Sequence, residues 1–187
     1  MKTEIQRRSP HGFLDYLSLA VSTFGVGYFP IAPGTWGSAV GVVVYLFVVW
    51  AVGAASIALF GTDGHATDAF YADARAILCL ALLAFSLFGI WAANRANDLQ
   101  GNSDPSQTVV DEVMGQLITF LFIPFTFSWK LILAGFLLFR LFDIWKPYPI
   151  DSLQSLPGGV GVCADDIVAG VYAGVVLMVI YAISWWV

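Results

Sequence analysis

The chain contains long stretches without a single Asp, Glu, Lys or Arg, and these stretches limit how it can fold. The longest, Tyr16–Thr62, has 47 residues, and the others are Ala76–Asn94 with 19, Val113–Trp129 with 17 and Ile167–Val187 with 21. A helix needs about 20 apolar residues to cross a bilayer. Hydrophobic residues make up 59% of the chain and charged residues 11%, against about 45–50% and 25% in soluble domains. The chain is therefore expected to be a membrane protein.

The pattern predicts an all-α, polytopic membrane bundle with about five spanning helices and an N-terminal amphipathic or re-entrant element at Phe13–Phe24. Gly and Pro interrupt the longest window, so we place an irregular turn at Tyr28–Gly37 and a span near Ser38–Phe60. The segment Trp129–Ile144 is a shorter span. The windows lack strand-like alternation, and backbone groups in lipid must be paired internally, so helices are favoured over a barrel. Without repeats or linkers, residues 1–187 are expected to form one domain.

Basic residues near the ends of spans predict the orientation, because they are enriched in cytoplasmic loops. Lys2, Arg7 and Arg8 place the N-terminus in the cytoplasm, whereas the acidic loop Gly61–Arg75 is placed outside. This requires that Phe13–Phe24 does not cross the membrane. Three polar stretches then share the cytoplasmic face, namely Tyr28–Gly37, Asp98–Glu112 and Arg140–Asp166.

Eight of the thirteen acidic residues lie between Asp98 and Asp166, and four of them form adjacent pairs, Asp111-Glu112 and Asp165-Asp166. Each pair stands where an apolar helix is expected to begin. The helix dipole favours an acid there by about 0.3–1 kcal/mol, so a structural explanation of one pair stays open. Several unpaired acids near hydrocarbon, at a cost of at least ~2.5 kcal/mol each, need compensation. A hard cation provides it, and because the chain has two His and two Cys, Mg²⁺ or Mn²⁺ is predicted over Zn²⁺.

Small residues follow the acids at helical spacing. Gly170 and Gly174 follow Asp166 at i+4 and i+8, and Gly115 follows Asp111 at i+4. Such glycines predict the close approach of a neighbouring helix. The glycine-rich segment 158–161 before the second acidic pair is interpreted as a flexible lid or a close-approach loop.

Two further features indicate anion binding. Arg140, Asp143 and Lys146 lie on one side of a helix end. They are either cations that favour a helix C-terminus and reach the interface, or a phosphate clamp beside the metal. The turn before Ser38 opens a helix, so its amides and the hydroxyls of Thr35 and Ser38 are candidates for holding an anion.

Four motifs stand in the order and spacing typical of one family: PGTWGS at Pro33–Ser38, DPSQTVVDEVMG at Asp104–Gly115, FRLFDIWKPYPI at Phe139–Ile150 and GGVGVCADDIVAG at Gly158–Gly170. The chain resembles the phosphatidylglycerophosphatase A family from about Pro30 to Gly174. The resemblance implies a Mg²⁺-dependent phosphatase of the bacterial inner membrane that converts phosphatidylglycerophosphate into phosphatidylglycerol and phosphate. It also implies an all-α bundle with one central helix ringed by others.

The resemblance implies roles for individual residues. The catalytic residues would be Asp111, Glu112, Asp143 and Asp166. The metal ligands would be Asp111, Glu112, Asp165 and Asp166. The substrate phosphate would be bound by Arg140 and Lys146, with help from Thr35 and Ser38. A metal-activated water is the preferred nucleophile, and an attacking carboxylate that forms an aspartyl-phosphate stays open.

Two other functions stay in competition with this one. Another membrane phospholipid phosphotransferase, of the CDP-alcohol type, also uses acids and a metal, but its DGxxAR signature is absent. A transporter that uses intramembrane acids fits less well, because these acids stand at span ends beside Arg and Lys. A phospholipid and the membrane are the expected partners. Nucleic acid is not, because the eight basic residues are scattered.

Overall fold

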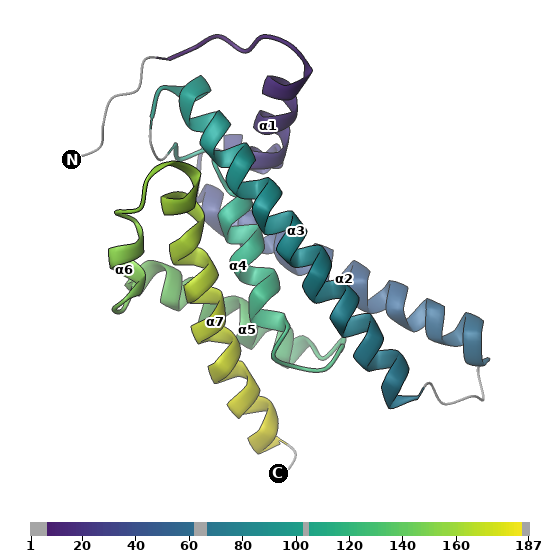
Figure 1. Cartoon of the computed structure of the whole chain (residues 1–187). Coiled ribbons are helices and arrows are strands. Elements are labelled where there is room, and N and C mark those ends of the chain that lie inside the picture. Colours follow the sequence, from purple (N-terminus) through teal and green to yellow (C-terminus); the bar gives the residue numbers. More distant parts are fainter. Residues whose placement is uncertain (1–6, 62–66, 103–104, 185–187) are drawn as a thin grey trace.

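The computed structural model describes residues 7–61, 67–102 and 105–184, and within them it contains helices and no strand (Figure 1). The elements are α1 (Phe13–Thr23), the 3₁₀ helix η1 (Val26–Tyr28), α2 (Pro33–Phe60), α3 (Asp68–Gln100), α4 (Val110–Phe120), α5 (Trp129–Trp145), α6 (Ile150–Leu153) and α7 (Gly158–Ser184). The prediction of an all-α fold is confirmed. Lys2, Asp104 and residues 62–66 of the expected outer loop lie outside the described residues.

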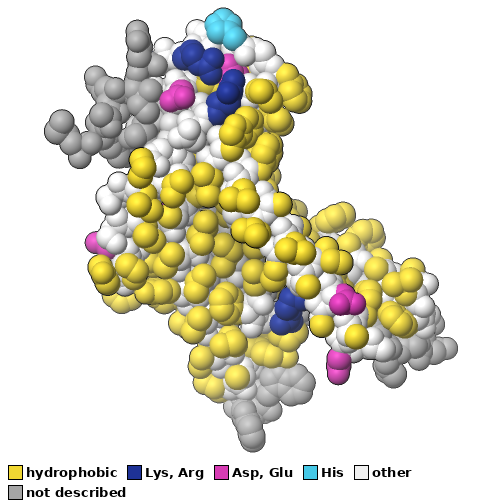
Figure 2. All heavy atoms as spheres, in the orientation of Figure 1, with side chains coloured by type: hydrophobic (Ala, Val, Ile, Leu, Met, Phe, Trp, Pro, Cys, Tyr) yellow, Lys and Arg dark blue, Asp and Glu magenta, His cyan; other side chains and the backbone are white. Residues whose placement is uncertain are grey.

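Three helices are long and apolar enough to cross a membrane: α2 with 28 residues, α3 with 33 and α7 with 27. The other two expected spans are shorter, since α4 has 11 residues and α5 has 17. At about 1.5 Å per residue, neither reaches across a hydrocarbon core of about 30 Å by itself. Hydrophobic side chains cover most of the visible face of the bundle (Figure 2). The fold is thus of a membrane type with three candidate spans, and the number of about five stays a prediction.

Helix α2 begins at Pro33, so Pro33–Gly37 is helical and the expected irregular turn is wrong in its second half. Proline suits the first helical turn because its missing N–H would have no intrahelical partner there. The glycines that follow permit close packing and do not break the helix. A Cβ on Gly34 would overlap the carboxylate of Glu112, and one on Gly37 would come within 2.9 Å of the Val109 Cβ.

The glycine-rich segment 158–161 forms the first turn of α7. Its interpretation as a lid is therefore wrong, whereas the close approach is confirmed. A Cβ on Gly159 would overlap the carbonyl oxygen of Ile90 in α3. The Gly159 amide also donates to the Asn94 Oδ1 at 3.2 Å, so α3 holds the start of α7 in place.

Helix α1 has its polar side toward the protein and its apolar side outward. Its buried residues are Asp15, Ser18, Ser22 and Thr23. Phe13 is 77% exposed, and Leu14 and Tyr16 are also exposed. The reverse arrangement is usual in a water-soluble protein. The expected N-terminal element is therefore amphipathic, and its outward face suits lipid.

The buried Asp15 carboxylate is fully paired. Its Oδ1 accepts from Arg8 Nη2 at 2.9 Å and from Arg95 Nε at 2.7 Å. Its Oδ2 accepts from the backbone N–H of His11 at 2.7 Å. These bonds join the N-terminal segment and α1 to α3.

Helix α4 lies at the centre of the molecule, in contact with α1, α2, α3, α5 and α7 (Figure 1). Its contact with α7 is close because two glycines meet, and a Cβ on Gly170 would overlap the backbone of Gly115. The close approach expected from these glycines is confirmed. The central helix ringed by others, which the resemblance implies, is also present.

Candidate active site

Several helix ends come together around a cavity of about 700 Å³. The N-terminal turns of α2, α4 and α7 and the C-terminal end of α5 contribute to its wall. Three of the long-range approaches described above, through Gly34, Gly159 and Gly170, hold these elements together. The charged residues that line the cavity are Asp111, Glu112, Asp143, Lys146, Asp165 and Asp166.

Three of these acids form a cluster without a cation. One carboxylate oxygen from each of Asp111, Glu112 and Asp166 lies within 4.8 Å of the others. Asp111 is 9% exposed and Asp166 is 3% exposed. The Asp111 Oδ1 and the Glu112 Oε2 are buried without a hydrogen-bond partner. Among the described residues, no Lys or Arg forms an ion pair with any of the three.

The donor set of this cluster consists of carboxylate oxygens, which hard divalent cations such as Mg²⁺ prefer. Buried, unpaired carboxylates so close together are otherwise unfavourable, because desolvation and mutual repulsion both oppose their charged forms. The orphaned oxygens therefore fit a bound cation of this class.

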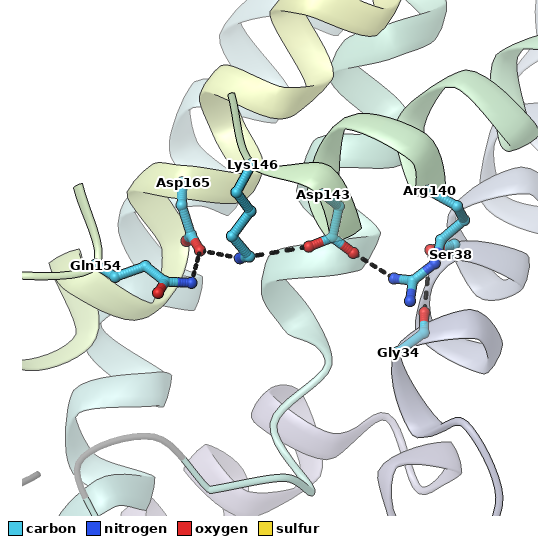
Figure 3. A network of polar contacts seen from close by, with 7 residues as sticks. All are labelled: Gly34, Ser38, Arg140, Asp143, Lys146, Gln154 and Asp165. Carbon is cyan, nitrogen blue, oxygen red and sulfur yellow. Dashed lines mark hydrogen bonds and ion pairs between the residues drawn. The ribbon is translucent and has the colours of Figure 1, made fainter. Parts of the chain in front are cut away.

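The remaining acids are paired with cations in a chain of polar contacts (Figure 3). The Asp165 Oδ2 accepts from Lys146 Nζ and, at 3.0 Å, from Gln154 Nε2. Lys146 Nζ also lies 3.5 Å from the Asp143 Oδ1. The other oxygen of Asp143 accepts from Arg140 Nη1. Two cations are thus held next to the cation-free acid cluster.

Lys146 stands immediately after α5, in a left-handed conformation with φ of 46°. Burial by itself lowers the pKa of this side chain, but the hydrogen bond and charge of Asp165, together with Asp166 and Asp143, raise it above its ordinary value. The ammonium group is therefore protonated at neutral pH and carries a full positive charge at the cavity wall.

The chain matches the family model described as phosphatidylglycerophosphatase A over residues 19–181. It belongs to the phosphatidylglycerophosphatase A family. A phosphatidylglycerophosphatase A from Haemophilus influenzae is 32% identical over 174 residues, which cover 92% of this chain and 91% of that protein. A phosphatidylglycerophosphatase A from Escherichia coli is 30% identical over 158 residues, which cover 82% of this chain and 77% of that protein.

A third relative carries a different name. A protein of Bacteroides thetaiotaomicron named "Putative phosphatidylinositol-3-phosphatase" is 35% identical over 174 residues, which cover 92% of this chain and 96% of that protein. No solved structure matches the chain.

In this chain, a member of the phosphatidylglycerophosphatase A family, the predicted site residues divide into three groups. Asp111, Glu112 and Asp166 form the cation-free cluster. Of the second acidic pair, Asp166 belongs to this cluster and Asp165 does not. The others form the paired chain of Asp143, Asp165, Arg140 and Lys146. Thr35 and Ser38 stand in the first two turns of α2 and, like Arg140, are not among the residues that line the cavity.

The hydroxyls of Thr35 and Ser38 do not face the cavity. Ser38 is buried, and its Oγ donates to the Gly34 carbonyl at 3.0 Å within the helix. Thr35 is exposed. Pro33 and Gly34 line the cavity in their place.

Two residues that hold the site in place through hydrogen bonds were not predicted from the sequence. Gln154 donates to Asp165, and Asn94 accepts from the start of α7. Asn94 is the last residue of a 19-residue window without charge, so its polarity there was a usable signal. Gln154 lies in a polar stretch after α6, where nothing in the local pattern separates it from its neighbours.

Proposed function

We propose that this chain hydrolyses the terminal phosphate monoester of phosphatidylglycerophosphate, giving phosphatidylglycerol and phosphate in a Mg²⁺-dependent reaction at the cytoplasmic face of the bacterial inner membrane. The observation that carries the proposal is the cation-free cluster of Asp111, Glu112 and Asp166 beside two paired cations. Family membership supports the phosphatase reaction. The three apolar helices support a substrate that resides in a membrane.

Asp111, Glu112 and Asp166 would hold the metal ion. When bound, Mg²⁺ supplies a Lewis acid that neutralises charge on the phosphate oxygens. Asp165 was also predicted as a metal ligand, but it accepts hydrogen bonds from Lys146 and Gln154. We therefore propose that Asp165 positions the Lys146 ammonium group.

Arg140 and Lys146, which lie beside the acid cluster, would bind the phosphate. Arg offers a planar fork of donors and Lys a point charge, and both stabilise charge on a transferring phosphoryl group. Asp143 lies between the two cations and keeps both oriented before substrate arrives. Preorganised charges of this kind need little rearrangement during the reaction.

We also propose about five membrane crossings, with α4 and α5 as the short ones and the N-terminus in the cytoplasm. Arg7, Arg8 and Arg95 lie at the end of the molecule that carries α1, whereas Asp68 and Asp73 lie at the opposite end of α3. Basic residues favour the cytoplasmic side. In this orientation the cavity opens where the headgroup of an inner-leaflet lipid is located.

Phosphatidylinositol 3-phosphate is a second candidate substrate, because the relative from Bacteroides thetaiotaomicron is named for it. The family model and two relatives favour phosphatidylglycerophosphate. Both headgroups carry a phosphate monoester on a polyol, so the reaction chemistry is the same.

The test is phosphate release from each lipid in mixed micelles, with Mg²⁺ or with a chelator. We expect release from phosphatidylglycerophosphate only with Mg²⁺, and none from the Asp111→Asn variant purified in parallel. That variant controls for contaminating phosphatases. Faster release from phosphatidylinositol 3-phosphate would favour the second candidate, and release from neither lipid would refute the proposal.

A further inference from the structure

Thr108 carries a buried hydroxyl without a partner at the wall of the active-site cavity. The residue is 5% exposed and lines the cavity, and its Oγ1 has no hydrogen-bond partner among the described residues. It lies in the turn before α4, where its amide donates to the Pro105 carbonyl at 3.0 Å. Asp111 of the acid cluster follows three residues later.

Other buried hydroxyls of the chain are used within the fold. The Thr119 Oγ1 donates to the Gly115 carbonyl at 3.0 Å and lies 3.3 Å from the Gly170 carbonyl. The Ser18 Oγ and the Thr23 Oγ1 each donate to a carbonyl within α1 at 2.8 Å. A buried hydroxyl without a partner opposes folding, so the fold itself gives no reason for this side chain at position 108.

The other hydroxyls at the cavity are less suited to bind a ligand. The Ser155 Oγ donates to the Ser152 carbonyl at 2.7 Å. Ser106 is exposed and therefore solvated. Thr108 is thus the hydroxyl of this wall, within the described chain, that gains most from a partner that enters the cavity.

We infer that the Thr108 hydroxyl binds the headgroup hydroxyl on the carbon next to the phosphorylated carbon. The inference rests on the proposed function and specifies its substrate class. A headgroup whose phosphate reaches the acid cluster places its next carbons only a few bonds away, against the wall formed by Pro105, Ser106 and Thr108. Both headgroups considered above carry a hydroxyl on that neighbouring carbon.

This contact selects lipid polyol phosphates over lipid phosphates that lack the hydroxyl. A site built to bond a substrate hydroxyl discriminates strongly against an analogue without it, because its own polar group is then left buried and unpaired. Phosphatidic acid, whose neighbouring oxygen is acylated, belongs to the disfavoured class.

The test compares wild type with Thr108→Val on two substrates. One is phosphatidylglycerophosphate, and the other is its analogue with propane-1,3-diol in place of the terminal glycerol, which lacks only the neighbouring hydroxyl. We expect Thr108→Val to lower kcat/KM for the natural lipid by about tenfold or more, and to change kcat/KM for the analogue by less than about twofold. Thr108→Ser keeps the hydroxyl and should restore the preference.

Thr119→Val is the control, because it removes a buried, partnered hydroxyl near the other end of α4, away from the cavity. It should lower Tm and affect both substrates equally, whereas Thr108→Val should leave Tm unchanged or higher. Equal losses on both substrates with Thr108→Val would overturn the inference while the proposed function stands. Failure of wild type to hydrolyse either lipid would overturn the proposed function and this inference with it.

Discussion

Buried carboxylates occur in two regions of the molecule. In one they are paired with cations of the protein, and in the other they are not. In the first, Asp15 receives hydrogen bonds from two arginines and one backbone amide. In the second, Asp111, Glu112 and Asp166 face one another, and no cation of the described chain is paired with them. Arg95, which pairs with Asp15, is adjacent in α3 to Asn94, which accepts a hydrogen bond from the first turn of α7, the helix that carries Asp166. An acid that the protein itself neutralises serves the fold, and acids left without partners need a ligand.

The largest effect is expected from removing charge in the unpaired cluster. Asp111→Asn, Glu112→Gln and Asp166→Asn should each lower kcat/KM by at least about 100-fold, because a bound metal contributes several kcal/mol to the transition state. Each variant should keep its metal-free Tm or raise it, since a repulsive charge is removed. Phosphate release and thermal unfolding measure the two quantities.

Asp68→Asn is the control for these variants, because Asp68 is an exposed acid at the opposite end of α3. It should leave turnover unchanged. Near-normal turnover in two of the three cluster variants would show that the cluster does not bind a metal required for catalysis. It would then not differ in function from Asp15.

An intermediate effect is expected from the cations that border the cluster. Arg140→Lys loses the fork geometry, and Lys146→Ala loses the charge. A charge-assisted bond is worth about 1.5–3 kcal/mol, which corresponds to roughly 10- to 150-fold in kcat/KM. If Arg140 and Lys146 only extend to the membrane–water interface and do not bind phosphate, kcat/KM of Arg140→Lys will stay within about twofold of wild type.

The smallest effect on activity is expected at the paired acid. Asp15→Asn should lower Tm, because Arg8 and Arg95 lose their partner, yet kcat at neutral pH should stay within about twofold, since the site is not touched. A collapse of kcat without a change in Tm would contradict the structural role of Asp15.

The pH dependence sharpens this prediction. The hydrogen bond from the His11 amide, with those from Arg8 and Arg95, outweighs burial and holds the pKa of Asp15 below its ordinary value. Its contribution to stability is therefore complete above the unfolded-state pKa of about 3.9 and is lost as pH falls through the lower folded-state pKa. The Tm difference between wild type and Asp15→Asn should be constant from about pH 8 to 5 and shrink below about pH 3.9.

The sequence predicted the parts of this architecture that depend on local pattern. Windows without charge identified the long helices α2, α3 and α7. The second acidic pair was wrongly expected at a helix start, because α7 begins at Gly158, seven residues before Asp165. The first pair identified the start of α4 at the cavity, and the glycines at positions 115 and 170 identified the contact between α4 and α7. Each of these features follows from residues a few positions apart.

Features that depend on long-range contacts could not be predicted in this way. Hydropathy does not locate a helix end that is set by packing, so the window Val113–Trp129 extends past the end of α4 at Phe120. The division of the second pair, with Asp165 on Lys146 and Asp166 in the cluster, depends on how α7 is rotated against α5. The Pro and Gly of α2 indicated a turn because their packing partners lie far away in sequence.

The inverted polarity of α1 has a consequence for how the sequence can diverge. On a water-soluble helix, buried apolar residues are constrained and outward polar ones vary. Here the constrained positions are polar, led by Asp15 and Ser18, and Phe13, Leu14 and Tyr16 face outward. Related chains should therefore exchange one apolar residue for another along the outward face and keep the polar stripe. A substitution matrix made for soluble helices will misjudge which changes in this segment are tolerated.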